Sequence, residues 1–143
     1  MKEIENIKLE EWLNELKPYQ KNSINVLIEQ YGEEKAAEIW ITSNGPSNNV
    51  PFGGTSKNTQ PFFDRFKHEF QKFICGHPDY DSYRKKLGAE TPVIKILYIS
   101  MISSAIGATI GFSATLLAPA VAILLSTVGQ MGLNAYCAGI DLK

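Results

Sequence analysis

The residues best suited to metal or nucleophilic chemistry in this chain are two histidines and two cysteines. His68, Cys75 and His77 lie close together in the sequence, and Cys137 is the other cysteine. Structural zinc needs four ligands at a recognisable spacing, which these residues do not provide. No serine–histidine–acid catalytic triad can be recognised around either of the two histidines. We therefore predict no metal site and no catalytic residues. An enzyme that uses His68 or His77 is the least favoured alternative.

A glycine-rich stretch inside a long connection is the second candidate for chemistry. Residues 53–57, GGTSK, have the composition of a phosphate-cradling loop. They lack the Walker spacing and follow no apolar strand, so we predict no bound nucleotide or other cofactor. The connection, residues 43–60, is long for a small domain, and long loops often carry function. Phe52, Gly53 and Gly54 are therefore candidate recognition residues, and a solvated connector held by Phe52 is the alternative.

The charge distribution divides the chain into two unlike parts. The 143 residues carry a net charge of −1 and are 44% hydrophobic, which excludes a disordered chain. Nucleic-acid binding needs a clustered basic surface, so we expect no nucleic-acid partner. After residue 92 only Lys95, Asp141 and Lys143 are charged, and residues 96–140 contain no Asp, Glu, Lys, Arg or His. We predict a helical domain over residues 1–90 and an apolar segment over residues 91–143.

Helical periodicity runs through the first part. Apolar residues recur at helical spacing, and proline or glycine separates the segments. The predicted helices cover residues 8–16, 22–31, 33–41, 60–74 and 79–87. The fourth is the most amphipathic, because Phe62, Phe66, Phe70 and Phe73 form one stripe. We expect this stripe to pack in a core rather than lie on a membrane surface.

The apolar segment predicts a helical hairpin. Pro92 and Pro119 each suit the first turn of a helix, which places the two helices at residues 92–110 and 119–136. At 1.5 Å per residue each helix is about 27–28 Å long, just enough to cross a hydrocarbon core of about 30 Å. The predicted fold is all-α, an N-terminal bundle of short amphipathic helices followed by a C-terminal apolar hairpin.

Small residues recur along the hairpin at four-residue steps. In lipid, such residues allow helices to approach closely and associate. The predicted packing or pore positions are Ser103, Gly107, Gly111, Ala118, Ala122, Ser126, Gly129 and Gly132. Gln130 and Asn134 are the candidate polar residues of a lumen.

These features favour a small membrane-active protein. Its hairpin would insert in or span a bilayer and oligomerise into a pore or channel, gated by the helical domain. The expected partners are membrane lipid, other copies of the chain and a sensor or regulator protein. Positive residues flank the hairpin at residues 84–86, Lys95 and Lys143, which predicts both termini in the cytoplasm. Two cysteines are too few for a disulfide scaffold and are typical of a reducing compartment.

Three arrangements of the hairpin remain open at this level. It could reside permanently in the membrane, or it could be buried in a soluble form and insert later. The alternative function is a soluble, cytoplasmic all-α interaction module, an adaptor or regulator, with the hairpin as its core or as a homo-oligomer interface. An uncharged pair of helices fits each of these arrangements, because a buried core and lipid both exclude charge.

Overall fold

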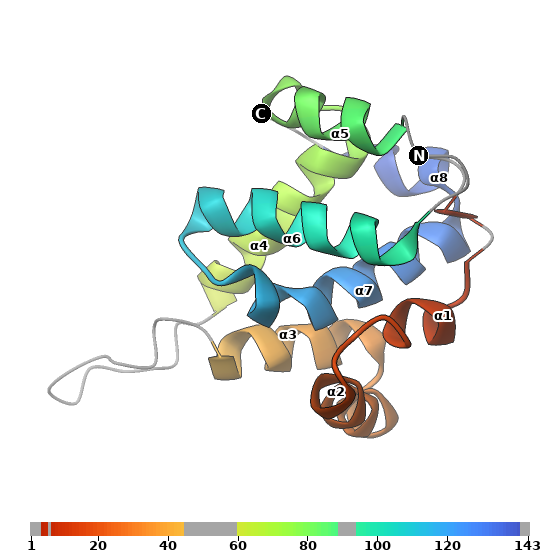
Figure 1. The fold of residues 1–143 in the computed structure, drawn as a ribbon, viewed down its shortest axis with the longest axis vertical. Coiled ribbons are helices and arrows are strands. Elements are labelled where there is room, and N and C mark those ends of the chain that lie inside the picture. Colours follow the sequence, from red (N-terminus) through yellow and green to blue (C-terminus); the bar gives the residue numbers. More distant parts are fainter. Residues whose placement is uncertain (1–3, 6, 45–59, 89–93, 141–143) are drawn as a thin grey trace, which may run out of the picture.

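The computed structural model describes residues 4–5, 7–44, 60–88 and 94–140, and it confirms the all-α fold (Figure 1). Within these ranges every predicted helix has a counterpart, and no strand is present. In chain order the α-helices are α1 (Leu9–Leu13), α2 (Pro18–Tyr31), α3 (Glu33–Asn44), α4 (Gln60–Cys75), α5 (Asp81–Gly88), α6 (Lys95–Ile110), α7 (Ala114–Met131) and α8 (Leu133–Cys137). A 3-10 turn, η4 (Pro78–Tyr80), precedes α5. The apolar helices therefore follow an amphipathic bundle, as the sequence predicts.

Helix α7 is the central element of the fold. It contacts α1, α2, α3, α6 and α8, and in Figure 1 it runs between α6 on one side and α3 on the other. All residues from Pro119 to Ser126 are buried. A run of this length covers more than two helical turns and so faces every direction. Protein side chains therefore enclose the middle of α7 on all sides.

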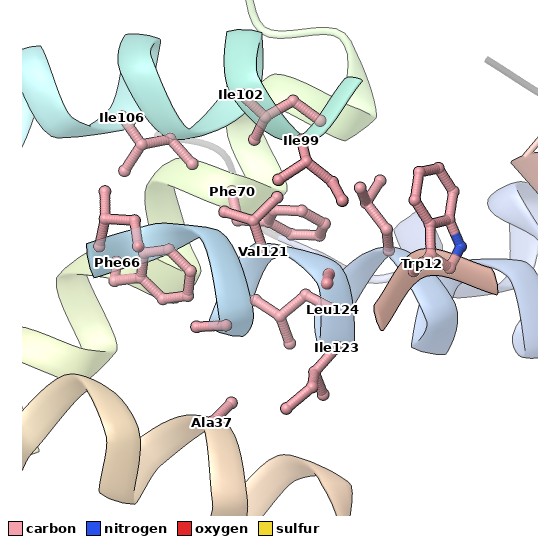
Figure 2. Packing of buried hydrophobic residues seen from close by; sticks show 14 of the residues in the cluster. Trp12, Ala37, Phe66, Phe70, Ile99, Ile102, Ile106, Val121, Ile123 and Leu124 are labelled. Carbon is pink, nitrogen blue, oxygen red and sulfur yellow. The ribbon is translucent and has the colours of Figure 1, made fainter. Parts of the chain in front are cut away.

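The core is formed by α6 and α4 packing with this central helix. Figure 2 shows Ile99, Ile102 and Ile106 of α6 directed towards α7, with aromatic rings from α4 beside them. Three of the four residues of the α4 stripe are fully enclosed, because Phe66, Phe70 and Phe73 each have a relative exposure of 0%. Burying a side chain of this size contributes about 1.5–3 kcal/mol. The stripe packs in the core, as expected, while Phe62 is only partly buried and packs edge-on against Phe112.

The start of α7 differs from the sequence prediction. The helix begins at Ala114 rather than Pro119, which is its sixth residue and lies inside it. Proline has no N–H, so the carbonyl of Thr115 loses its usual helical donor. Gln20 Nε2 donates to that oxygen at 2.8 Å, and Trp40 Nε1 donates to the next carbonyl, that of Leu116, at 2.7 Å. These donors from α2 and α3 allow the helix to continue through the proline.

The C-terminal end also differs, because the second apolar helix ends at Met131 rather than at residue 136. Gly132 follows with a φ of 89° and redirects the chain into the short helix α8. There, Cys137 forms a disulfide with Cys75 at the end of α4, with the two Cα atoms 5.6 Å apart. The interpretation of the two cysteines as reduced thiols is therefore wrong for this fold. Only the return of α8 onto α4, which the sequence does not reveal, brings them together.

Two sequence predictions lie outside the described residues. The candidate recognition residues Phe52, Gly53 and Gly54 belong to the segment between α3 and α4, residues 45–59. The predicted helix start at Thr91 and Pro92 belongs to residues 89–93, and the first described residue of this part is Ile94, the N-cap of α6.

Candidate functional site

The α6–α7 hairpin is the candidate functional site, and its two helices have different surroundings. The middle of α7 is enclosed, whereas α6 packs on α4, α5 and α7 and leaves one side open. The exposed residues of that side are Ile96, Ser100, Ser104, Ala108 and Thr109. We call these five residues the uncharged face, because none of them carries a charge although water reaches them.

Side-chain hydrogen bonds join the hairpin to the helices that cover it. Besides the bonds from Gln20 and Trp40, Thr109 of α6 lies 3.2 Å from the hydroxyl of Tyr80, which donates to Glu69 at 2.5 Å. Burial raises the pKa of the Tyr80 hydroxyl, so it remains a neutral donor. Gln20 and Trp40 therefore attach the first turn of α7 to α2 and α3, and Tyr80 of η4 lies against the last turn of α6.

The polar residues near Cys75 form a structural corner between α4 and α5. The guanidinium of Arg84 donates to the carbonyls of Phe73 at 2.9 Å and His77 at 2.8 Å. His77 Nδ1 accepts the N–H of Asp79 at 3.0 Å and so caps η4. A hydrogen bond from Lys72 lowers the pKa of Asp79. His77 is thus engaged in capping, and Cys75 and Cys137 in a cross-link. Among the described residues no group of three potential ligands could hold a metal ion.

The predicted packing residues lie at contacts within one chain. Ser103, Ala122 and Ser126 are buried, while Ala118 is half-buried. A Cβ added to Gly107 would collide with the carbonyl oxygen of Phe112, and one added to Gly129 would lie 2.9 Å from that of Ile4.

Gly111 and Gly132 instead end α6 and α7 with positive φ values of 78° and 89°. Of the candidate lumen residues, Gln130 is exposed and donates to Ser126 Oγ at 3.2 Å, and Asn134 is exposed on α8. The small residues are therefore explained by helix ends and close contacts within one chain. Association between hairpins stays a prediction.

Sequence reasoning missed Gln20, Trp40 and Glu5. Gln20 is 1% exposed despite its polar side chain, and the Glu5 carboxylate accepts the N–H of Leu133 at 2.7 Å, where α8 begins. The available signal was Pro119 itself, in the middle of an otherwise uninterrupted apolar run. A proline there requires outside donors if the helix continues, but the sequence does not show which side chains supply them.

One described helix is long and apolar enough to cross a bilayer. It is α7, with 18 residues and a mean hydropathy of 1.6, whereas α6 has 16 residues. Core helices of soluble proteins pass the same test, and 56% of the α7 window is buried here. Length and hydropathy alone therefore do not distinguish a core helix from an inserting one.

Comparisons with known proteins add no relative from which a function could be transferred. No family model, no curated protein and no solved structure matches this chain.

Proposed function

We propose that this protein is membrane-active and that it stores its apolar hairpin in a folded bundle before transferring it to a bilayer. Helices α1–α4 act as the cover that keeps α7 from water. A trigger, such as a sensor protein or the lipid itself, opens the cover. The released hairpins then insert with both termini on the same side of the bilayer and associate into a pore, since one hairpin cannot enclose a water path.

The uncharged face carries this proposal. Core packing explains why the buried side of a helix lacks charge, but it places no such demand on the exposed side. Surfaces of soluble domains are rich in Lys, Arg, Asp and Glu. Nevertheless the exposed residues from Ile96 to Thr109 are all uncharged, and no charged residue occurs from Ile96 to Ile140. A helix that must later enter hydrocarbon needs an uncharged circumference, because each central charge costs about 2.5–3.5 kcal/mol on insertion.

Dye release from lipid vesicles tests the proposal with a variant that charges only this face. The double substitution Ser104→Lys and Ala108→Lys places two ammonium groups at exposed positions of α6. The folded bundle can solvate both, so we expect an unchanged circular dichroism spectrum and melting temperature. Insertion should be strongly disfavoured, and we expect release to fall at least tenfold below that of the wild-type protein.

Val26→Lys is the matched control, because Val26 of α2 is 51% exposed and lies outside the hairpin. It adds a positive charge without charging the inserting segment, and it should release dye as the wild type does. Wild-type-like release by the double lysine variant would contradict the proposal. The absence of release by the wild type from vesicles of both zwitterionic and anionic lipid would exclude the lipid itself as the trigger.

The enclosure of α7 favours a second candidate, a soluble all-α interaction module with the hairpin as its core. Gln20 and Trp40 supply donors to the carbonyls of Thr115 and Leu116 in the turn before Pro119, which is what a permanent core helix would require. This candidate expects a protein that stays monodisperse in buffer and is washed from membranes by carbonate. The membrane-active protein should remain in the washed pellet after activation.

A further inference from the structure

A groove lies where the corner between α1 and α2 meets the hairpin. It has a volume of about 290 Å³. Leu16 and Gln20 form one wall of the groove, Ile99 and Ser103 of α6 form another, and Ala118 of α7 closes it. Leu16, Gln20, Ile99 and Ser103 are buried, so the groove has a formed floor rather than a floor of exposed side chains. Small-molecule sites begin at about this size.

Ser103 gives this groove an unfulfilled hydrogen-bonding group. The residue is 1% exposed, and its Oγ has no hydrogen-bond partner among the described residues. Hydroxyls in a helix commonly donate to the carbonyl four residues earlier. Thr109 and Thr127 do so in the same hairpin, to Ala105 and Ile123, both at 3.1 Å. Since a buried unpaired polar group is costly, a bound partner at Ser103 would remove a penalty that the free protein carries.

The remaining lining defines the chemistry of that partner. Ser100 lies three residues before Ser103 and therefore on the same face of α6, which adds a second hydroxyl at the opening. Ile96, Ile99 and Ala118 offer an apolar side. Glu15 and Lys17 lie at the rim with opposite charges, so the groove selects neither an anion nor a cation.

We propose that this groove binds a small uncharged amphiphile, whose carbonyl or hydroxyl oxygen accepts from Ser103 and whose alkyl part lies on the isoleucines. The groove shares Ile96 and Ser100 with the uncharged face, but it does not depend on the proposed membrane activity, because it exists in the folded bundle whether or not the hairpin is ever released. Because its walls come from the α1–α2 connection, α2, α6 and α7 together, such a ligand also favours the closed form over any form in which the cover has left the hairpin.

A titration of the full-length protein with butyramide, followed by the amide signals in 15N–1H NMR spectra, tests this site. Butyrate and butylammonium serve as charged probes of similar length. We expect saturable shifts confined to the α1–α2 corner, α6 and the first turns of α7, with butyramide binding at least fivefold more tightly than either charged probe.

Ser103→Ala is the informative variant, because it removes a hydroxyl that makes no bond in the free protein and so leaves the fold intact. It should weaken butyramide binding by about two- to tenfold, the range for one hydrogen bond. Ser126→Ala is the control, since Ser126 is equally buried but is bonded to Gln130; it should bind butyramide as the wild type does.

A second variant, Ala118→Leu, fills the groove and should abolish the shifts. Three results would overturn the proposal: no saturable shift with butyramide, binding that is indifferent to Ser103→Ala, or tighter binding of a charged probe. If an exchanging water is detected at Ser103 and butyramide does not bind, water alone occupies the groove, and this result would also overturn the proposal.

Discussion

Pro119 leaves the carbonyl of Thr115 without its usual helical donor, and Gln20 of α2 replaces that donor from outside the helix. We expect Gln20→Leu to destabilise the protein by about 1–3 kcal/mol, the cost of a buried acceptor left unpaired. Pro119→Ala restores an N–H to the helix, so the loss caused by Gln20→Leu should be smaller in the Pro119→Ala background. Urea unfolding of the wild type, both single variants and the double variant measures this coupling.

The double-mutant cycle tests whether Gln20 compensates for the missing N–H of Pro119. If the effects of Gln20→Leu and Pro119→Ala simply add, then Gln20 does not compensate for the proline. Val26→Lys, on the exposed side of α2, controls for a general effect of altering that helix; it should change the free energy of unfolding by less than about 0.5 kcal/mol.

Gly129 illustrates how a small residue on the hairpin serves the folded monomer. Glycine to alanine in a helix interior normally stabilises by about 0.5–1 kcal/mol. At Gly129 an added Cβ would lie 2.9 Å from the backbone oxygen of Ile4, and a backbone atom cannot rotate away as a flexible side chain can. We therefore expect Gly129→Ala to destabilise by about 1–3 kcal/mol, measured by thermal unfolding. A stabilised variant would show that the N-terminal segment does not pack there.

At the scale of elements, periodicity alone placed most of the helices. The predicted helices at residues 33–41, 60–74 and 79–87 lie within α3, within α4 and across η4 and α5. These predictions succeed because an amphipathic helix that faces one core shows its buried side directly in the spacing of its apolar residues. The phenylalanine stripe of α4 is the clearest example, since its spacing predicted the core.

The hairpin could not be delimited in the same way, because both of its helices are apolar on nearly every side. Periodicity then gives no boundary, and the usual position of proline in the first turn of a helix places the predicted start at Pro119. The true start depends on Gln20 and Trp40, which lie far away in the sequence. The groove depends on the same packing of α1 and α2 against the hairpin, and so does the position of Ser103 within it. The disulfide likewise depends on α8 returning to α4.

The disulfide should contribute substantially to the attachment of α8. Residues Cys75 and Cys137 are 62 positions apart, and closing a loop of that length stabilises the folded state by about 4 kcal/mol. Reduction should lower the midpoint of urea unfolding and increase hydrogen exchange in α8 first, because α8 has no fully buried residue. The double variant Cys75→Ala and Cys137→Ala should have the same midpoint of urea unfolding as the reduced protein, and added reductant should not change it. A reduced protein as stable as the oxidised one would contradict this prediction.

Tyr136 makes the attachment of α8 sensitive to alkaline pH. Its ring packs edge-on against Phe70 with centroids 6.3 Å apart, and burial raises the pKa of its hydroxyl to about 12. A pKa raised on folding means that the stabilisation is complete below the unfolded value of about 10 and is lost as the pH rises towards 12. Hydrogen exchange of α8 should increase across that window, and Tyr136→Phe should reduce the change. If hydrogen exchange of α8 depends on pH in the Tyr136→Phe variant as it does in the wild type, another group causes the effect.

Charge is partitioned across the whole molecule in a way that links stability to the proposed membrane activity. The charged residues of the described chain lie before the hairpin, in the segments up to α5, and at Lys95, while the central helix and the uncharged face have none. Water can therefore reach the cover at little cost, whereas the exposure of α7 to water is unfavourable. Transfer to a bilayer would then require the cover to open while lipid is near.

The rate of vesicle leakage should consequently follow the stability of the cover. Each 1.4 kcal/mol of destabilisation raises the population of an open form about tenfold, so Gln20→Leu and reduction of the disulfide should both accelerate leakage. Ser104→Lys with Ala108→Lys should slow it although the cover is intact, because these lysines act on the inserting helix. Stopped-flow dye release measured on these three proteins distinguishes opening of the cover from insertion of the hairpin. If Gln20→Leu lowers stability but leaves the leakage rate at the wild-type value, opening of the cover does not limit transfer, and the stored-hairpin mechanism fails even if the protein binds membranes.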